Sequence, residues 1–127
     1  MNTTAQLIAE ARGRIEHLSP SAVEAERDSG EVVLVDLRET EERAQHGSIA
    51  GAVHAPRGML EFYADPTSAY HRFPFDPSRR TILYCASGGR STLAADSLQR
   101  LGYTRVAHLD GGLKAWRDAG LQVEAGT

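Results

Sequence analysis

The sequence predicts an α/β fold in which a mainly parallel sheet carries helices on both faces. Short β-branched or aliphatic runs recur at residues 32–35, 53–55, 81–84 and 106–109. Segments with helical spacing of apolar residues separate these runs. The runs are continuous rather than alternating, which is typical of strands buried on both faces of a parallel sheet. Right-handed crossovers between such strands would place helices on both sides.

The chain is expected to begin with helices. The first 18 residues are interpreted as a helical extension, because apolar residues recur there at helical spacing. These residues are Ile8, Ala11, Ile15 and Leu18. A second helix is expected over residues 20–29, with Ser19 as its N-cap and Pro20 as its first residue. Gly30 is expected to end it.

The remaining sequence is interpreted as one domain over residues 19–122, with a short tail at 123–127. Helices are expected at residues 39–45 and 58–64, between Gly89 and Gly102, and around Trp116. The stretch between the second of these helices and Arg80 contains three prolines and is interpreted as an ordered loop.

The bulk composition excludes several classes of function. The 127 residues suit one hydrophobic core, and the net charge of -3 comes from well-mixed charges without a basic stripe, so nucleic-acid binding is not expected. No leader peptide is recognised, and no apolar run approaches the ~20 residues that a membrane-spanning helix needs. The single cysteine excludes an intramolecular disulfide, and a cytoplasmic location is expected.

The stretch Cys85-Ala86-Ser87-Gly88-Gly89-Arg90-Ser91 follows a predicted strand at its carboxyl end, where open α/β sheets bind ligands. The two glycines permit a turn whose N–H groups converge on an anion, and the next helix adds its dipole. Arg90 adds a full charge. These features favour thiolate over thiol, so Cys85 is the candidate nucleophile. The catalytic residues are then Cys85 and Arg90, and the anion-binding residues are Ala86, Ser87, Gly88, Gly89 and Ser91. Two alternatives are an inert buried cysteine and a plain phosphate loop.

Four motifs in order resemble the rhodanese-like family of sulfurtransferases, over residues 19 to 120. They are Val35-Asp36-Leu37-Arg38-Glu39, the segment from His46 to His54, the Cys85 loop, and Leu109-Asp110-Gly111-Gly112 followed by Trp116. The resemblance implies a five-stranded sheet and no cofactor. It also implies that Cys85 accepts a sulfane sulfur as a persulfide, held by the amides of residues 86–91. The donor would be a small anion such as thiosulfate. Since no second cysteine is present, a thiol, a partner protein or cyanide would remove the sulfur.

Two other functions remain open at this point. One is a sulfur-relay or regulatory module with little turnover of small molecules. The other is a phosphatase or an arsenate reductase, two classes that the same resemblance includes. Cys85 to Arg90 spans six residues, and the resemblance implies one residue more in the loops of those enzymes. No Asp or Glu adjoins Cys85 in the sequence to protonate a leaving alkoxide.

Arg57, after the second strand, is a further candidate anion-binding residue if it faces the pocket; the alternative is that it lies on the surface. The segment 57–80 is a candidate for shaping access. Asp36 and Arg38 are interpreted as structural, with Asp36 capping a turn and Arg38 bracing loops. The five histidines show no close metal-ligand spacing, so no metal is expected. Trp116 is expected in the core, and Asp110 is expected near a helix N-cap.

Overall fold

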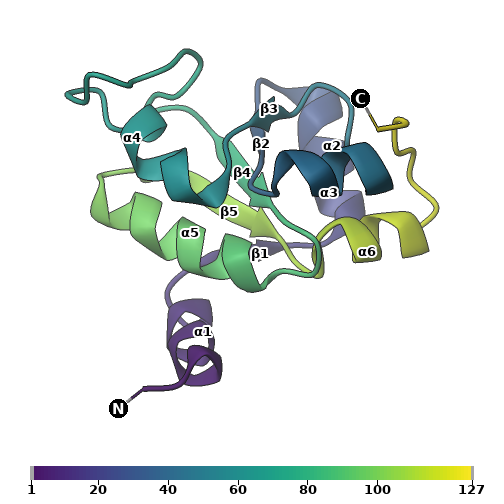
Figure 1. Ribbon diagram of the computed structural model, residues 1–127, viewed down its shortest axis with the longest axis horizontal. Coiled ribbons are helices and arrows are strands. Elements are labelled where there is room, and N and C mark those ends of the chain that lie inside the picture. The colour runs from purple at the N-terminus through teal and green to yellow at the C-terminus, as the bar shows by residue number, and fades with distance from the viewer. Residues whose placement is uncertain (1, 127) are drawn as a thin grey trace.

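In the computed structural model, which describes residues 2–126, a five-stranded parallel sheet has the strand order β1-β5-β4-β2-β3 (Figure 1). The strands are β1 (Glu16–Leu18), β2 (Val33–Asp36), β3 (Val53–His54), β4 (Thr81–Tyr84) and β5 (Val106–Leu109). Every pair of neighbouring strands is parallel. The predicted α/β class and the parallel five-stranded sheet are confirmed, and the strands of sequence positions 81–84 and 106–109 have the predicted bounds.

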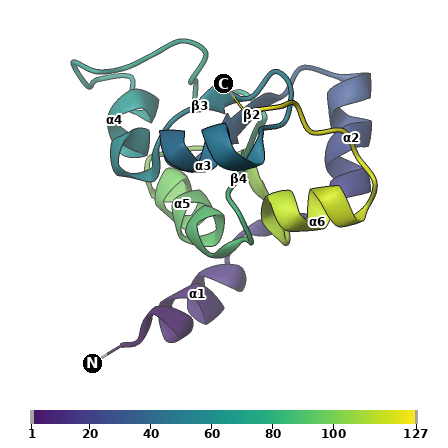
Figure 2. The same cartoon turned by 45° about the vertical axis from the view of Figure 1, so that its right-hand side comes forward.

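Helices cover both faces of the sheet, as Figures 1 and 2 show. They are α1 (Thr4–Arg12), α2 (Pro20–Ser29), α3 (Thr40–His46), the 3-10 turn η1 (Arg57–Met59), α4 (Leu60–Ala64), α5 (Gly89–Arg100) and α6 (Gly112–Asp118). Alternate strand residues serve two separate cores. Val33 and Val35 face α4 and α5, whereas Leu34 faces α2 and α6. The central strands are therefore buried on both sides, which is why their sequences are continuously apolar.

The expectation of a helix extending to Leu18 is wrong. α1 ends at Arg12, the chain turns at Gly13, and residues 16–18 form the edge strand β1 beside β5. Ile15 and Leu18 match the helical spacing by coincidence. Each is apolar because it packs against one of the two cores, Ile15 against the core on the α5 side and Leu18 against the core on the α2 side. The sheet consequently begins before residue 19, where the helical extension was expected to give way to the domain.

Helix termini follow the sequence signals in most places. Ser19 caps α2 by accepting the Ala22 N–H at 3.2 Å, and Gly30 follows its last residue, as predicted. Asp110 lies near a helix N-cap, as predicted: it directly precedes Gly111, the N-cap of α6, and its carboxylate pairs with Arg12 at 3.1 Å. A glycine suits this cap since its φ is 80°, in the left-handed region.

A buried ion pair fixes the carboxyl ends of the two central strands. The Arg38 guanidinium donates Nε–H and Nη2–H to both carboxylate oxygens of Asp36 at 3.0 and 2.8 Å. Both side chains are almost fully buried, at 1% and 0% exposed. Arg38 also donates to the carbonyl of Gly47, and the Tyr84 hydroxyl donates to Asp36. The structural roles predicted for Asp36 and Arg38 are confirmed.

Burial by itself would raise the pKa of Asp36, but the hydrogen bonds from Arg38 and Tyr84 outweigh it and hold that pKa below its usual value. The carboxylate therefore stays charged and continues to hold Arg38.

Within residues 2–126, none of the helices combines the length and the apolar character that crossing a bilayer requires.

Candidate active site

Cys85 lies directly after β4, at the bottom of the loop that leads into α5. Its side chain is buried, with the residue 1% exposed. The Gly88 N–H donates to Cys85 Sγ at 3.2 Å, and Sγ lies 3.6 Å from Ser91 Oγ. The sulfur thus faces both a loop amide and the first turn of α5. Two of the predicted anion-binding residues, Gly88 and Ser91, therefore contact it.

Glycines on two separate loops let the backbone reach this geometry. Gly88 has a φ of 113°, which non-glycine residues avoid, and it is the N-cap of α5. Gly112, with a φ of 62°, brings the start of α6 so close that a side chain there would collide with the backbone of Cys85 and Ala86. The Leu113 N–H donates to the Cys85 carbonyl at 2.9 Å, so the first turn of α6 is hydrogen-bonded to the start of the Cys85 loop. The Asp-Gly-Gly turn is thereby explained.

Arg90 lies beside the sulfur but is already paired. Its guanidinium donates two hydrogen bonds to the Glu42 carboxylate of α3, at 2.7 and 2.8 Å. This pairing, more than any other contact, lowers the pKa of Glu42 to about 2. Cys85 is a further contributor to the raised pKa of Arg90. The Arg90 charge at the site is consequently shared between Glu42 and Cys85.

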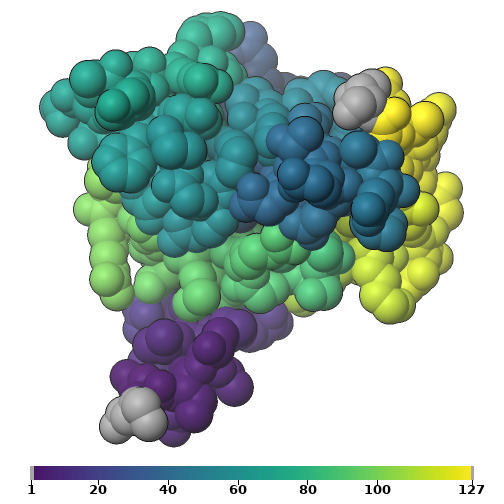
Figure 3. Space-filling view, in the orientation of Figure 1, coloured from purple at the N-terminus to yellow at the C-terminus, as the bar shows by residue number. Residues whose placement is uncertain are grey.

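The cavity above Cys85 has a volume of about 290 Å³. It is lined by Thr4, Ile8, Cys85, Ser87, Gly89, Arg90 and Leu93. Two of these residues belong to α1, which stands out from the body of the molecule beside α5 (Figures 1 and 3). The N-terminal helix therefore forms a wall of the candidate site. The sequence contained no signal for this, because Thr4 and Ile8 are an ordinary polar and an ordinary apolar position of an amphipathic helix.

Ala86 lies on the other side of the loop. It borders a second cavity of about 270 Å³, between α3 and α6. The residues around that cavity are Arg38, Glu42, His46, Ala86, Leu113, Lys114 and Arg117. Ser87, by contrast, is exposed at the tip of the loop. The predicted anion-binding residues thus share one loop but face two cavities.

Arg57 does not join the site. Its guanidinium donates to both carboxylate oxygens of Glu61 at 2.8 and 2.9 Å, and it borders a separate groove with Arg14 and Ser97. The structure thus places Arg57 outside the Cys85 cavity. The segment 57–80 likewise contributes no residue to the Cys85 cavity. α1 lines that cavity instead, because it packs against α5.

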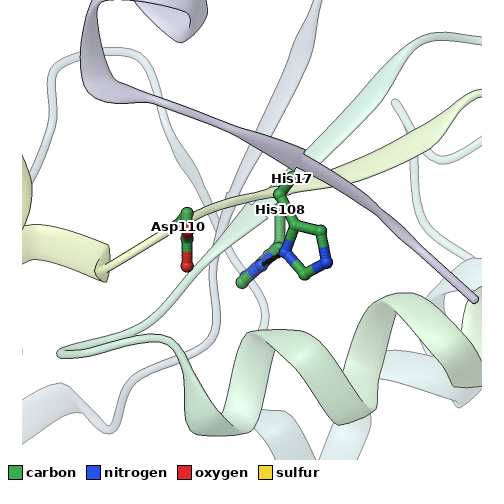
Figure 4. Close-up of side chains that lie close together, drawn as sticks. All are labelled: His17, His108 and Asp110. Atoms are coloured by element: carbon green, nitrogen blue, oxygen red, sulfur yellow. Dashed lines mark hydrogen bonds between the residues drawn. The ribbon is translucent and has the colours of Figure 1, made fainter. Parts of the chain in front are cut away.

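Two histidines that are far apart in the sequence meet next to the active loop. β1 pairs with β5 so that His17 stands opposite His108, and their facing ring nitrogens lie 2.8 Å apart (Figure 4). With Asp110 they place three ligand atoms within 4.8 Å of one another. The two facing nitrogens, however, bond to each other, and Asp110 is paired with Arg12. The cluster is accordingly a hydrogen-bonded pair of rings. Sequence spacing could not reveal it, since strand register creates it.

Stability is expected to fall in mild acid because of His108. Burial, with the neighbouring His17 as the next cause, lowers its pKa from 6.5 to about 4. Between these two pH values the unfolded chain binds a proton that the folded chain does not. The stabilisation is thus complete above about pH 6.5 and is lost as the pH falls to about 4, a loss of about 3 kcal/mol.

Urea unfolding of the wild type and of His108→Gln across this pH range measures that loss. The unfolding free energy of the variant should depend less steeply on pH. The two proteins have the same acidic residues, so they differ only in the contribution of His108. Equal pH slopes for the two proteins would contradict the assignment.

Comparison with known proteins gives one consistent family. A family model described as the rhodanese-like domain matches residues 19–119. A sulfurtransferase of Allochromatium vinosum is 37% identical over 98 residues, which cover 77% of this chain and 83% of that protein. An uncharacterised protein of Synechocystis is 34% identical over 105 residues, covering 82% of this chain and 53% of that protein. The chain thus spans about half the length of this second relative.

Solved structures resemble the whole chain. A protein of unknown function from Rhodopseudomonas palustris, described as a possible tyrosine phosphatase, is 40% identical with a TM-score of 0.92. That match covers 98% of this chain and 96% of the other. The thiosulfate sulfurtransferase from Pseudomonas aeruginosa is 29% identical with a TM-score of 0.78, covering 98% of this chain and 23% of that chain.

Proposed function

Since this chain belongs to the rhodanese-like domain family, we propose that it is a sulfurtransferase in which Cys85 carries a sulfane sulfur as a persulfide. The observation that carries the proposal is the placement of the chain's one thiol. It lies at the bottom of a small cavity, with its sulfur against the Gly88 amide and beside Arg90. Sulfurtransferases are also among the relatives with 30% identity or more.

The chemistry proceeds in two displacement steps. The Cys85 thiolate attacks the outer sulfur of a donor such as thiosulfate, the S–S bond of the donor breaks, and sulfite leaves with the bonding electrons. The resulting persulfide anion is held by loop amides and by the positive end of α5. A thiol acceptor or cyanide then takes the outer sulfur, which returns Cys85 to the thiolate. Charge balances in both steps without a cofactor.

A phosphatase function is less well supported. Phosphoester cleavage needs an acid to protonate the leaving alkoxide. None of the described residues that line the Cys85 cavity is Asp or Glu, and the nearby Glu42 is held as an anion by Arg90. The six-residue loop from Cys85 to Arg90 points the same way.

Parallel assays with thiosulfate plus cyanide, an aryl phosphate and arsenate test the proposed function. Thiocyanate should form, and neither phosphate release nor arsenate reduction should exceed the rate of a Cys85→Ser variant. Turnover of aryl phosphate without thiocyanate formation would overturn the proposal. Rapid formation of persulfide with slow transfer to every small acceptor would identify a sulfur-relay module, whose acceptor is another protein.

Arg90 and Glu42 are expected to affect donor capture in opposite directions. Arg90→Met removes the positive charge and should raise the KM for thiosulfate roughly tenfold, because about 1–2 kcal/mol of attraction is lost near the surface. Glu42→Gln leaves Arg90 uncompensated and should lower that KM. Steady-state kinetics at low ionic strength measure both. Changes of the same sign in the two variants would mean that the pair acts only as a structural brace.

A further inference from the structure

A continuous line of hydrogen bonds runs from Cys85 to the surface of the molecule. Cys85 Sγ lies 3.6 Å from Ser91 Oγ, and this hydroxyl lies 2.8 Å from His108 Nδ1. His108 Nε2 lies 2.8 Å from His17 Nδ1, as Figure 4 shows. His17 Nε2 then meets the backbone carbonyl of Arg12 at 2.9 Å. The line crosses α5, β5 and β1 and ends at Arg12, the last residue of α1.

The last contact fixes the direction of every hydrogen bond in the line. A carbonyl oxygen only accepts, so His17 carries its proton on Nε2, and its Nδ1 is an acceptor. His108 must then donate from Nε2, which leaves its Nδ1 as the nearer acceptor for the Ser91 hydroxyl, at 2.8 Å against 3.2 Å to the Gly88 carbonyl. The Ser91 oxygen in turn accepts the S–H of Cys85. All protons are therefore oriented from the thiol towards β1.

The line begins at the Cys85 cavity and meets solvent again at His17. Ser91 and His108 are each 0% exposed and Cys85 is 1% exposed, whereas His17 is partly exposed. A nearly buried thiol that must ionise can pass its proton along this line as well as into the cavity. The inner three groups offer such a path without the entry of water between them.

We propose that Ser91, His108 and His17 form a proton relay that ionises Cys85, a role that rests on the proposed function of Cys85 as nucleophile. The S–H bond of Cys85 breaks as its proton passes to Ser91 Oγ, while Ser91 gives its own proton to His108 Nδ1. His108 gives its Nε2 proton to His17 Nδ1. The products are a thiolate and a His17 imidazolium, with Ser91 and His108 neutral again. The Ser91 hydroxyl is left pointing at the sulfur as a donor to the thiolate.

The charges around the two rings are compatible with this path. Asp110, at the end of β5, and Arg12, at the end of α1, face the histidines and are paired with each other at 3.1 Å. Ser91 is the neighbour from α5. The lowered pKa of His108 means that this ring is neutral at rest and does not keep the proton. His17, the partly exposed ring, is the end of the line from which the proton can pass to solvent.

Nitrogen NMR of the imidazole rings tests the direction of the line in the whole chain. Both His17 and His108 are expected to carry their proton on Nε2 at neutral pH. A proton on Nδ1 of His108 would overturn the proposal, because that nitrogen could not then receive a proton from Ser91.

The pH profile of Cys85 alkylation by iodoacetamide tests the transfer itself. His17→Gln can still accept the His108 hydrogen bond but cannot take up a proton, and Ser91→Ala breaks the line. Each is expected to move the profile up by about one pH unit, a roughly tenfold slower reaction near neutral pH. The rates should converge with the wild type in alkali, where hydroxide takes the proton directly. His71→Gln, the same change at a histidine bonded only to its own loop, should match the wild type.

A His17→Gln profile that coincides with the wild type would overturn the relay. Because alkylation and NMR require no sulfur transfer, the two proposals fail separately. Persulfide formation with an unshifted profile would leave sulfur transfer standing without the relay. A shifted profile without persulfide would leave the relay standing and remove the proposed function.

Discussion

Cys85→Ser is expected to abolish sulfur transfer, with kcat/KM for thiosulfate falling on the order of 10³-fold or more. A serine hydroxyl stays protonated near neutral pH and does not accept a sulfane sulfur, so neither displacement step can begin. The chain contains one cysteine, and no second thiol can substitute for it. Thiocyanate formation from thiosulfate and cyanide measures the loss.

The same variant should fold normally, because oxygen for sulfur is a small change at a site that already accepts a hydrogen bond from Gly88. A thermal melt of the variant serves as the control. Residual transfer above about a tenth of the wild-type rate, in a folded protein, would show that sulfur moves without passing through Cys85.

Arg38→Met is expected to cost about 3–5 kcal/mol of unfolding free energy, the largest loss of stability that a single substitution here should cause. The change leaves Asp36 charged, 0% exposed and without its main partner. It also removes the hydrogen bond to the Gly47 carbonyl, which holds the turn after α3. Urea denaturation at neutral pH measures the difference.

Arg100→Met is the matched control. Arg100 is also an arginine bound to an aspartate, Asp96, but its side chain is 76% exposed. Exposed ion pairs of this kind contribute within about 1 kcal/mol. Similar losses in the two variants would contradict the account of a buried, strand-fixing ion pair, and so would a loss below about 1 kcal/mol for Arg38→Met.

The central sheet could be predicted from the sequence because its strands are buried on both faces. Residues 81–84 and 106–109 are continuous apolar runs with turn residues on both sides, and local composition alone is enough to place them. β1 could not be predicted in the same way. It is only three residues long, lies at the sheet edge, and includes the polar His17. Its strand character comes from pairing with β5, which the local sequence does not encode.

The contacts of the candidate site likewise fall into those that the local sequence predicts and those that long-range packing creates. Cys85, Gly88 and Ser91 belong to one contiguous motif that runs from the end of β4 into the first turn of α5, so their contacts followed from the motif. The pairing of Arg90 with Glu42 depends on the position of α3, and the Ile8 wall depends on the packing of α1 against α5. Long-range packing produces both contacts, and residue type gives no sign of them. Arg57 follows β3, which predicts a place near the pocket, but Glu61 holds its side chain outside the Cys85 cavity.

The central claim is that Cys85 carries a transferable sulfur, and the intact mass of the protein after incubation with thiosulfate tests it most directly. The wild type should gain about 32 Da, one sulfur atom, and should lose it again when cyanide or a thiol is added. Cys85→Ala, treated in the same way, should keep its original mass. The account is contradicted if the wild type shows no adduct, or if Cys85→Ala acquires the same one.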